Sequence, residues 1–482
     1  MDPIALQDLV QAVNGTLLSE NIPEGLQITG AEYDTRKIRG DDVFFAFKGE
    51  NSDGHRYVPK ALEEGAAGAV VSEKPESPVP GKFYVLVEDT IKAFGDLARW
   101  YRSQFSIPVV GVTGSVGKTT TKDMIASVLS EKFETVKTEG NFNNHIGLPY
   151  TVLHLSHTTQ AAVIEMGMNH LGEIDYLVHI AQPTIAVITN IGEAHIGILG
   201  SRENIFRAKS EIFSGLAAGG TAILNGDDDY QPMLKDDAKA GKIFDGKNPA
   251  KGFHLIFQGE GENCDYRAVD IRDDLEHEVT FTGKTPKGDI AFTVPALGRH
   301  MIYPVLTACA VGHLVGETNE EIRNGVLHYV PTKMRMETLH LPGNILVYND
   351  TYNANPQSMK SGLHTLARTK GYRHVAVVGD MFELGDMTEE LHRGIGSYVA
   401  ELNRDPEHRI DALITVGEAA AFIAKEAKAQ GVPDVFCCND KEEAKVVLDD
   451  QIRKDTAFLV KASRGMALEE LTKYIGETAE KE

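Results

Sequence analysis

The sequence predicts an α/β protein with three domains: a small α/β N-terminal domain, a central domain built on a P-loop-type parallel sheet, and a C-terminal Rossmann-like doubly wound domain. Short apolar, β-branched segments alternate with helical segments along most of the chain, which is typical of parallel sheets covered on both faces. A glycine-rich loop joins one such strand to a helix in the central part. The length of 482 residues is enough for about two to four domains with separate cores.

The predicted N-terminal domain covers residues 1–88. A helix is expected near Ile4–Val13, then a buried strand in DDVFFAFKG, a second helix from about Val58, and a strand in AGAVVSE. The run Ser72–Lys82 contains three prolines and therefore predicts a loop.

The predicted central and C-terminal domains cover residues 89–332 and 333–482. The spacing of their strands suits βαβ crossovers, so each domain should contain a parallel sheet. The acidic, glycine-containing stretch at about 250–290 predicts an appended antiparallel hairpin. The expected strands of the two domains are Ile107–Gly114, Ala161–Gly167, Thr184–Gly192, Thr221–Asp228, Asn344–Asp350, His374–Asp380, Asp411–Gly417 and Ala457–Ser463.

Composition excludes several classes of protein. With 48 Lys+Arg and 70 Asp+Glu the net charge is −22, which argues against a nucleic-acid binder. The N-terminal segment MDPIALQDLVQAVNG lacks the features of a secretion signal, and no apolar run is long enough to cross a bilayer. Four cysteines are too few for a disulfide framework, so we expect a soluble, cytoplasmic protein.

The loop TGSVGKTT follows an apolar strand and precedes a helix, as phosphate-binding loops do. Backbone N–H groups and the helix dipole bind phosphate there, Lys118 reaches the terminal phosphates, and the Thr119 hydroxyl suits Mg²⁺. Val112 stands where the strict pattern has glycine, so the match is incomplete. The predicted nucleoside triphosphate site consists of Thr113, Gly114, Ser115, Val116, Gly117, Lys118, Thr119 and Thr120.

Three further polar residues follow strands or lie on the next helix. Glu165 closes one strand and could bind Mg²⁺, His195 lies just beyond the next strand, and Lys209 lies one helix later. Each has an ordinary structural interpretation, as a helix cap, a satisfied polar residue or a solvated lysine. Their occurrence together around a phosphate loop favours a reaction centre.

Six strings, in the same order along the chain, resemble the Mur ligase family: TGSVGKTTTKD, TEGNFNNHIGLP, IEMGMNHLGEI, NIGEAHIGILGSRENIFRAKSEI, YNDTYNANPQSM and GDMFELGDMTEELH. The resemblance covers essentially the whole chain. DTYNANPQSM and GDMFELG are similar to the member that adds a dipeptide. The string DNPR, typical of the member that adds the third, diamino residue, is missing.

The resemblance implies an ATP-dependent ligase that adds D-alanyl-D-alanine to UDP-N-acetylmuramoyl-tripeptide in the cytoplasmic stage of peptidoglycan synthesis. Such ligases join a carboxylate to an amine through an acyl phosphate. Because two anions must meet, catalysis should consist of metal clamping and cationic positioning. The implied cofactors are ATP and Mg²⁺, and the protein is expected to be a monomer without nucleic-acid or membrane partners.

By motif match, the resemblance also implies residue roles. Lys118 contacts the β- and γ-phosphates, while Thr119 and Glu165 hold Mg²⁺. His195 and Lys209 serve the acyl-phosphate side as metal-supporting groups, with Lys209 as a carbamate.

The remaining implied roles belong to the outer domains. Arg335 reaches the γ-phosphate from the C-terminal domain, and Asp350 binds the ribose. The UDP-substrate residues would be Thr35, Arg36, Phe47, Lys48 and Gly49. The acceptor dipeptide would be bound by Asn353, Asn355 and Ser358.

The larger departure from the family pattern lies at two positions near the expected adenine site. The family usually has His-Asn-x-x-Asn beside the adenine, whereas Met301 and Pro304 replace the two asparagines here. Neither side chain can hydrogen-bond to the base edge, so the sequence does not show how adenine is recognised.

Two alternative functions are compatible with the residues. A related Mur-type ligase would add a single amino acid instead of a dipeptide. A P-loop NTPase without amide chemistry would hydrolyse nucleotide with no dependence on an acceptor, but it would leave the neighbourhood of Lys209 unexplained.

Overall fold

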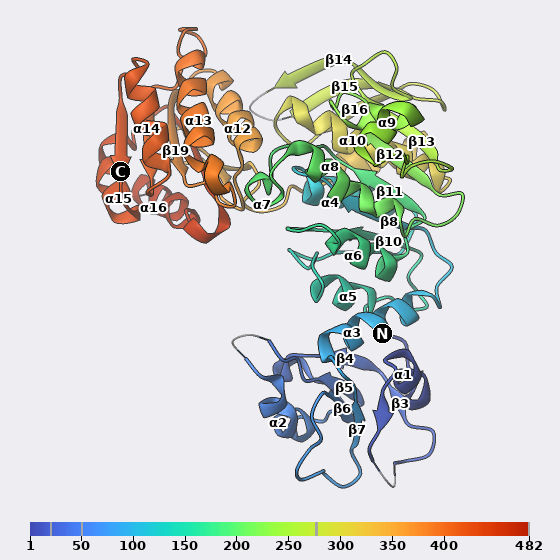
Figure 1. Cartoon of the computed structure of the whole chain (residues 1–482). Coiled ribbons are helices and arrows are strands. Elements are labelled where there is room, and N and C mark those ends of the chain that lie inside the picture. Colours follow the sequence, from blue (N-terminus) through green and yellow to red (C-terminus); the bar gives the residue numbers. More distant parts are fainter. Residues whose placement is uncertain (20–21, 50–51, 275–277, 481–482) are drawn as a thin grey trace.

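The computed structural model describes residues 1–19, 22–49, 52–274 and 278–480. Three larger sheets with their own helices follow one another along the chain (Figure 1). Strands β1 (Ile4–Ala5) and β3 (Gln27–Ile28) form a separate two-stranded antiparallel sheet. In that view the N-terminal sheet lies at the bottom, the central sheet above it, and the C-terminal sheet at the left. The predicted α/β class with three such units is therefore confirmed.

The N-terminal sheet has the order β2-β7-β6-β5-β4, in which β4 to β7 are parallel and β2 is antiparallel. The expected first helix is found, although Ile4–Ala5 forms a short strand before it, and Ser72–Lys82 consists of turns and irregular backbone as predicted. The elements are β1 Ile4–Ala5, α1 Leu6–Ala12, β2 Thr16–Leu17, β3 Gln27–Ile28, β4 Gly30–Glu32, β5 Asp42–Phe45, α2 Val58–Glu63, β6 Gly68–Val71 and β7 Phe83–Leu86.

The central sheet has the order β16-β15-β14-β13-β12-β11-β8-β10-β9. Its strands are β8 Val109–Thr113, β9 Thr135–Lys137, β10 Ala161–Glu165, β11 Ile185–Ile188, β12 Thr221–Asn225, β13 His254–Gly259, β14 Tyr266–Asp274, β15 Glu278–Lys284 and β16 Ile290–Val294. Its helices are α3 Thr90–Arg102, α4 Lys118–Leu129, α5 Gly147–Val152, α6 Glu173–Ala181, α7 Ile196–Leu199, α8 Arg202–Ser210, α9 Asp237–Ile243, α10 Ile302–Leu314 and α11 Asn319–Leu327.

The stretch at about 250–290 differs in part from the expected hairpin. Strands β14, β15 and β16 are antiparallel, as predicted. Strand β13, however, pairs in parallel with β12 and then with the start of β14. Because β13 continues the ladder of the central sheet, the antiparallel strands extend that sheet instead of forming a separate appendage.

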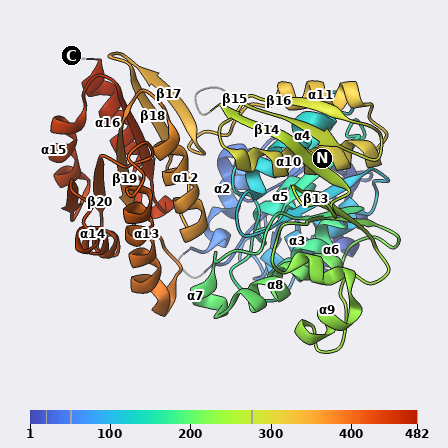
Figure 2. The same ribbon diagram turned by 90° about the horizontal axis from the view of Figure 1, so that it is seen from above.

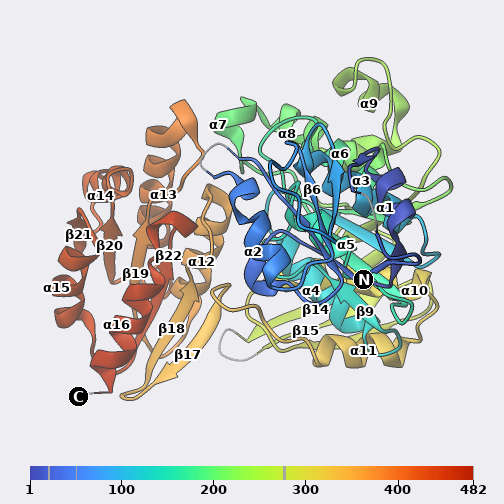
Figure 3. The same ribbon diagram turned by 90° about the horizontal axis from the view of Figure 1, so that it is seen from below.

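The C-terminal sheet has the order β17-β18-β22-β19-β20-β21, with only β17 antiparallel among the described strands. Helices α12 and α13 cover the face toward the central domain (Figures 2 and 3). The elements are β17 Glu337–Leu341, β18 Ile345–Asp350, α12 Pro356–Arg368, β19 Arg373–Gly379, α13 Thr388–Leu402, β20 Ala412–Val416, α14 Ala420–Ala429, β21 Val435–Cys438, α15 Lys441–Gln451, β22 Thr456–Lys461 and α16 Glu469–Ala479.

An aromatic cluster joins the N-terminal sheet to the central domain. Tyr33 and Phe47 follow β4 and β5, and their rings stack with centroids 5.1 Å apart. Both also pack edge-on against Phe94 of α3, and Tyr33 against Tyr150 of α5. Such aromatic pairs add directional contact energy to the area that they bury.

Glu32, at the end of β4, lies beside this cluster and gives the protein a pH-dependent stability. The Tyr150 hydroxyl donates a 3.1 Å hydrogen bond to its Oε1, and burial raises the pKa of the carboxyl to about 7. Because the folded-state pKa lies above the ordinary value, stability falls as the pH rises from about 4.5 to about 7.

We therefore expect Glu32→Gln to stabilise the protein above pH 7 by about 1–2 kcal/mol, a value reduced for the partial exposure of the group. Near pH 4 the substitution should have little effect, since both side chains are then neutral. Thermal unfolding at about pH 4 and about pH 8 tests this, with the exposed Glu63→Gln as control. Equal changes in the unfolding temperature of Glu32→Gln at both pH values would contradict this role of Glu32.

Candidate active site

The phosphate loop lies between β8 and α4, as the sequence predicts. Gly114 has φ +149°, and a Cβ there would lie 1.8 Å from the Oγ1 of Thr189, so no side chain fits. Gly117 has φ +81° directly before α4, a conformation that glycine adopts easily. The Lys118 ammonium donates a 2.8 Å hydrogen bond to the Gly114 carbonyl, which places its charge over the loop.

Some of the loop's donors are used within the protein. The N–H groups of Ser115 and Val116 donate to the carbonyl and the Oδ1 of Asn190, each at 3.0 Å. Thr113 is fully buried and its hydroxyl donates to the Met166 carbonyl, so it shapes the loop and does not face a ligand. In the described part of the chain no side chain caps α4, so its first-turn N–H groups remain for phosphate.

A cavity of about 1820 Å³ extends from this loop to the C-terminal domain. Its lining, as far as the structure describes it, does not include Lys209 or the five residues expected to bind the UDP substrate. The predicted site residues that line it are Ser115, Val116, Gly117, Lys118, Thr119, Thr120, Glu165, His195, Arg335, Asp350, Asn353, Asn355 and Ser358.

Thr119 and Glu165 lie together at the start of α4 and the end of β10. The Thr119 hydroxyl donates a 2.9 Å hydrogen bond to Oε2 of Glu165, and the Asn143 amide donates to Oε1 at 2.8 Å. A hydroxyl and a carboxylate are the hard oxygen ligands that suit Mg²⁺. Among the described residues no group of three or more His, Cys, Asp or Glu side chains could hold a metal, so phosphate and water would have to complete the coordination.

Arg335 comes from the segment that leads into the C-terminal sheet, yet it reaches the phosphate loop. Its guanidinium donates a 2.9 Å hydrogen bond to the Thr119 Oγ1 and lies 4.1 Å from the ring centroid of Tyr352. The flanking Met334 and Met336 have φ of +60° and +49°, an uncommon conformation for residues with side chains. The second domain thus supplies a fixed cation at the loop.

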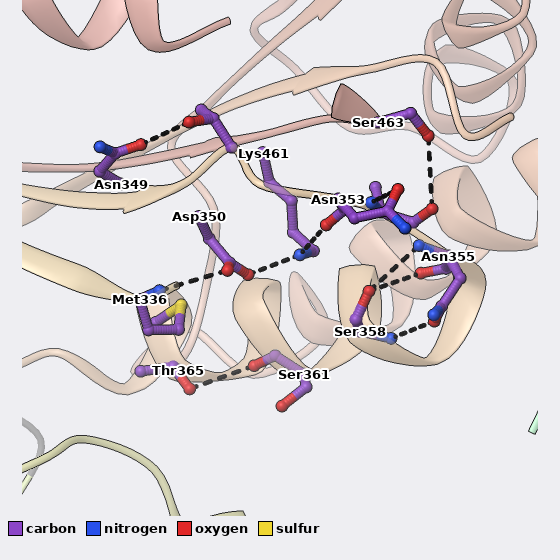
Figure 4. Close-up of polar contacts among 12 residues, drawn as sticks. Met336, Asn349, Asp350, Asn353, Asn355, Ser358, Ser361, Thr365, Lys461 and Ser463 are labelled. Carbon is purple, nitrogen blue, oxygen red and sulfur yellow. Dashed lines mark hydrogen bonds and ion pairs between the residues drawn. The ribbon is translucent and has the colours of Figure 1, made fainter. Parts of the chain in front are cut away.

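Asp350 and Lys461 are paired neighbours at the carboxyl ends of β18 and β22. The Lys461 ammonium lies 2.5 Å from Oδ2 of Asp350 and donates to the Asn353 carbonyl at 2.9 Å (Figure 4). Lys461 is only 2% exposed, so this ion pair holds the carboxylate firmly. Sequence analysis missed Lys461, although its position at a strand end beside Asp350 in the doubly wound sheet was a usable signal.

Asn355 and Ser358 have a structural role that the sequence analysis did not assign. Asn355 Oδ1 accepts a hydrogen bond from the Ser358 N–H at 2.9 Å, and the Ser358 hydroxyl accepts one from the Asn355 N–H at 3.1 Å (Figure 4). Together they form a capping box at the start of α12. Both line the cavity, but much of their hydrogen-bonding capacity is already used.

Lys209 lies on α8 with only 1% of its surface exposed. Burial, assisted by the charge of Lys118, lowers the pKa of its amine well below the usual range. A neutral amine is the form that captures CO₂, so this environment fits the predicted carbamate. His195 lies at the N-terminus of α7, where its Nδ1 is 2.7 Å from Oε2 of Glu383 in the C-terminal domain.

The residues expected to bind the UDP substrate lie at the carboxyl ends of β4 and β5, outside the cavity. Arg36 pairs with Asp34 and lowers the pKa of that carboxyl to about 2, while Lys48 lies 2.7 Å from Glu73. Both cations are largely exposed and could exchange these partners for phosphates. Phe47 already belongs to the aromatic cluster.

Met301 and Pro304 line the cavity at the start of α10, as expected if they lie beside the base. Gln258, at the carboxyl end of β13, lines the same cavity and is 2% exposed. Among the described residues, none donates a hydrogen bond to its Oε1. Its amide is therefore a candidate for contacts that the two replaced asparagines would have made, and no motif in the sequence singled it out.

Asparagine at position 304 should increase the preference for ATP. Because proline offers no polar side-chain atom, we expect Pro304→Asn to raise the ratio of kcat/KM for ATP over GTP by about tenfold, corresponding to about 1–2 kcal/mol. Pro304→Ala is the matched control, since it removes the proline without adding an amide. An unchanged ratio in Pro304→Asn would show that position 304 does not read the base.

Comparisons with known proteins agree with this architecture. Family models match as follows: the Mur ligase catalytic domain over residues 27–102, the Mur ligase middle domain over 112–312, and the Mur ligase glutamate ligase domain over 334–464. Among the relatives, the UDP-N-acetylmuramoyl-tripeptide–D-alanyl-D-alanine ligase of Bacillus subtilis is 37% identical, with 98% of each chain covered. The ligase of that name from Escherichia coli is 34% identical, with 99% of each covered.

Solved structures show the same three-domain arrangement. A crystal structure of MurF from Acinetobacter baumannii has a TM-score of 0.88 and 32% identity, covering 98% of this chain and 99% of that chain. MurF from Thermotoga maritima in complex with ADP has a TM-score of 0.79 and 27% identity, covering 94% of this chain and 98% of that chain. The matched family models and the full-length relatives identify an ATP-dependent peptide ligase. The chain belongs to the Mur ligase family.

Proposed function

We propose that this protein adds D-alanyl-D-alanine to UDP-N-acetylmuramoyl-tripeptide, converting ATP to ADP and phosphate, in the cytoplasmic stage of peptidoglycan synthesis. The observation that carries this proposal is the meeting of Arg335 with Thr119 across two domains, beside the Lys118 loop. The names of the full-length relatives supply the two substrates.

The chemistry explains why two domains must share one cavity. A carboxylate oxygen of the tripeptide attacks the γ-phosphorus, and the bond to the bridging oxygen of ADP breaks. The dipeptide amine then attacks the acyl carbon, loses a proton, and expels phosphate. Lys118 and Arg335 provide the cationic environment that two approaching anions need. Closure of the domains would exclude water, which otherwise hydrolyses the acyl phosphate.

The metal roles rest on the donor chemistry of the cavity. Thr119 and Glu165 would hold Mg²⁺, whose charge neutralises the phosphates when it is bound. His195 and a carbamate on Lys209 would support the acyl-phosphate side. The carboxylate of Asp350, held by Lys461, would accept hydrogen bonds from the ribose.

The remaining assignments follow the domains. Residues 1–88 would bind the UDP substrate at the carboxyl ends of β4 and β5. Residues 89–332 would bind ATP, and residues 333–482 would bind the dipeptide near Asn353. The protein would act as a cytoplasmic monomer without nucleic-acid or membrane partners. In the described part of the chain, no helix has the length and apolar character needed to cross a membrane.

ADP release with ATP, Mg²⁺ and UDP-N-acetylmuramoyl-tripeptide tests the proposal. Release should depend on D-alanyl-D-alanine and yield the UDP-linked pentapeptide. A preference for single amino acids would instead identify a related ligase of the family. Nucleotide hydrolysis that is independent of every acceptor would overturn the proposal in favour of a simple NTPase.

A further inference from the structure

A loop of the C-terminal domain is seated on the central domain beside His195. The loop runs from the end of β19 to the short 3₁₀ helix Gly385–Met387 and carries Glu383. Oε2 of Glu383 lies 2.7 Å from Nδ1 of His195, and the His195 side chain is only 18% exposed. Apart from the Arg335 segment, this contact is a second place where the C-terminal domain meets the reaction centre.

The backbones at this contact approach so closely that only glycine fits. A Cβ on Gly197 of α7 would lie 2.3 Å from the Gly385 nitrogen, and one on Gly385 would lie 2.9 Å from the Gly197 Cα. Figure 1 shows α7 reaching toward the C-terminal domain, in agreement with the packing of α7 on Gly385–Met387. We call this contact between Gly197 of α7 and Gly385 of the loop the seat. A single methyl group on either glycine would prevent the contact.

The two residues that meet at the seat both have uncommon backbone conformations. His195 has φ +65° and Glu383 has φ +64°. Left-handed conformations are unfavourable for residues with side chains and persist where the surroundings hold them, often at functional sites. Here the surroundings include residues from two domains, so the conformation of the seat depends on how the domains are placed.

The Glu383 carboxylate and the His195 ring face each other across the two domains, and the ring is largely buried. Oε2 of Glu383 is the carboxylate oxygen 2.7 Å from Nδ1 of His195, although Nδ1 has no hydrogen-bond partner of good geometry among the described residues. A small rotation of the ring would make this contact an Nδ1–H hydrogen bond to the carboxylate, which would fix the ring orientation and leave Nε2 as an acceptor. Holding His195 in this way requires Glu383, which arrives only with the C-terminal domain.

We propose that Glu383 is a positioning residue whose carboxylate orients His195 when the C-terminal loop is seated on α7, so that domain closure completes the reaction centre. The proposal rests on the proposed ligase function, because it is the closed state of that reaction that needs His195. An ordinary half-exposed ion pair would instead contribute little to stability or activity.

Two variants test the proposal, each with a matched control. Glu383→Gln removes the charge while keeping the shape, and its control is Glu389→Gln, at an exposed glutamate paired with Arg393 in the same domain. Gly197→Ala places a methyl group in the seat, and its control is Gly394→Ala, where nothing in the described structure lies within 4 Å of the added carbon.

For Glu383→Gln we expect kcat to fall at least tenfold, with the KM for ATP changed less than twofold and thermal unfolding unchanged. Hydrogen exchange in the presence of ATP and UDP-N-acetylmuramoyl-tripeptide should become faster at 195–200 and 380–387 than in the wild type. Gly197→Ala should show the same faster exchange and a similar loss of kcat. Both controls should behave as the wild type.

The proposal is wrong if Glu383→Gln matches Glu389→Gln in kcat and in exchange. It is equally wrong if activity falls only in proportion to a loss of thermal stability, because that result identifies a structural ion pair. Failure of the wild-type enzyme to form the UDP-linked pentapeptide would instead overturn the proposed function, and the exchange measurements on the seat would still report on Glu383.

Discussion

Alanine in place of Lys118 is expected to lower turnover by at least ~10²-fold, the scale of one preorganised electrostatic contact. The ammonium lies over the phosphate loop, bound to the Gly114 carbonyl, and burial in the cavity lowers its pKa while Glu165 and Glu383 counteract that shift. Its removal would take away the cation that this loop is proposed to present to the γ-phosphate. Folding should be unaffected, because the side chain contributes to the cavity and not to a core.

Rates of ADP release for Lys118→Ala, measured with saturating ATP and both substrates, check this expectation. Lys239→Ala, at an exposed lysine of α9, is the control for the loss of one positive charge. Circular dichroism and thermal unfolding establish that each variant is folded. A well-folded Lys118→Ala enzyme with near-normal turnover would show that this loop does not bind the transferred phosphate.

Lys209→Ala is expected to abolish activity. A free lysine with its usual pKa of about 10.4 is almost entirely protonated at neutral pH and cannot capture CO₂. Burial of Lys209 and the nearby charge of Lys118 lower the pKa of its amine and so favour the neutral form that reacts. The carbamate would convert the neutral amine into an oxygen-bearing anion that could support the metal, which alanine cannot do.

Three measurements test the carbamate. Native mass spectrometry should show the mass of one added CO₂ in the wild type and none in Lys209→Ala. Depletion of dissolved CO₂ should reduce wild-type activity, and bicarbonate should restore it. Formate should partly rescue Lys209→Ala by placing a small carboxylate in the vacated space. Full activity of an unmodified wild-type protein would exclude this role.

The strands that sequence analysis predicted in the central and C-terminal domains are the buried ones. Strands β8, β10, β11 and β12 in the central sheet, like β19, β20 and β22 in the C-terminal sheet, are apolar along most of their length because helices cover both faces. Strands β9, β17 and β21 were missed. They lie at the edges of the central and C-terminal sheets and expose part of their side chains, so their sequences lack a continuous apolar run.

The same contrast holds for the candidate site. Site residues that are neighbours in the sequence could be predicted, since the strand, glycine loop and helix around Lys118 form one local unit. Pairings between distant segments were not recognisable. These are Lys461 with Asp350 and Glu383 with His195, and likewise the presence of Gln258 and Pro304 in the lining of one cavity.

The sequence by itself determined the α/β class, the phosphate loop and the resemblance to the Mur ligases, because apolar periodicity and loop chemistry are local properties of the chain. Only the tertiary structure decided that the Asn355 and Ser358 side chains cap α12, that Lys209 is buried, and that Glu383 meets His195. These features depend on which strand ends become neighbours and on how one domain is seated on another. Distances of a few ångströms between segments far apart in the chain are set by that packing and leave no pattern in the sequence.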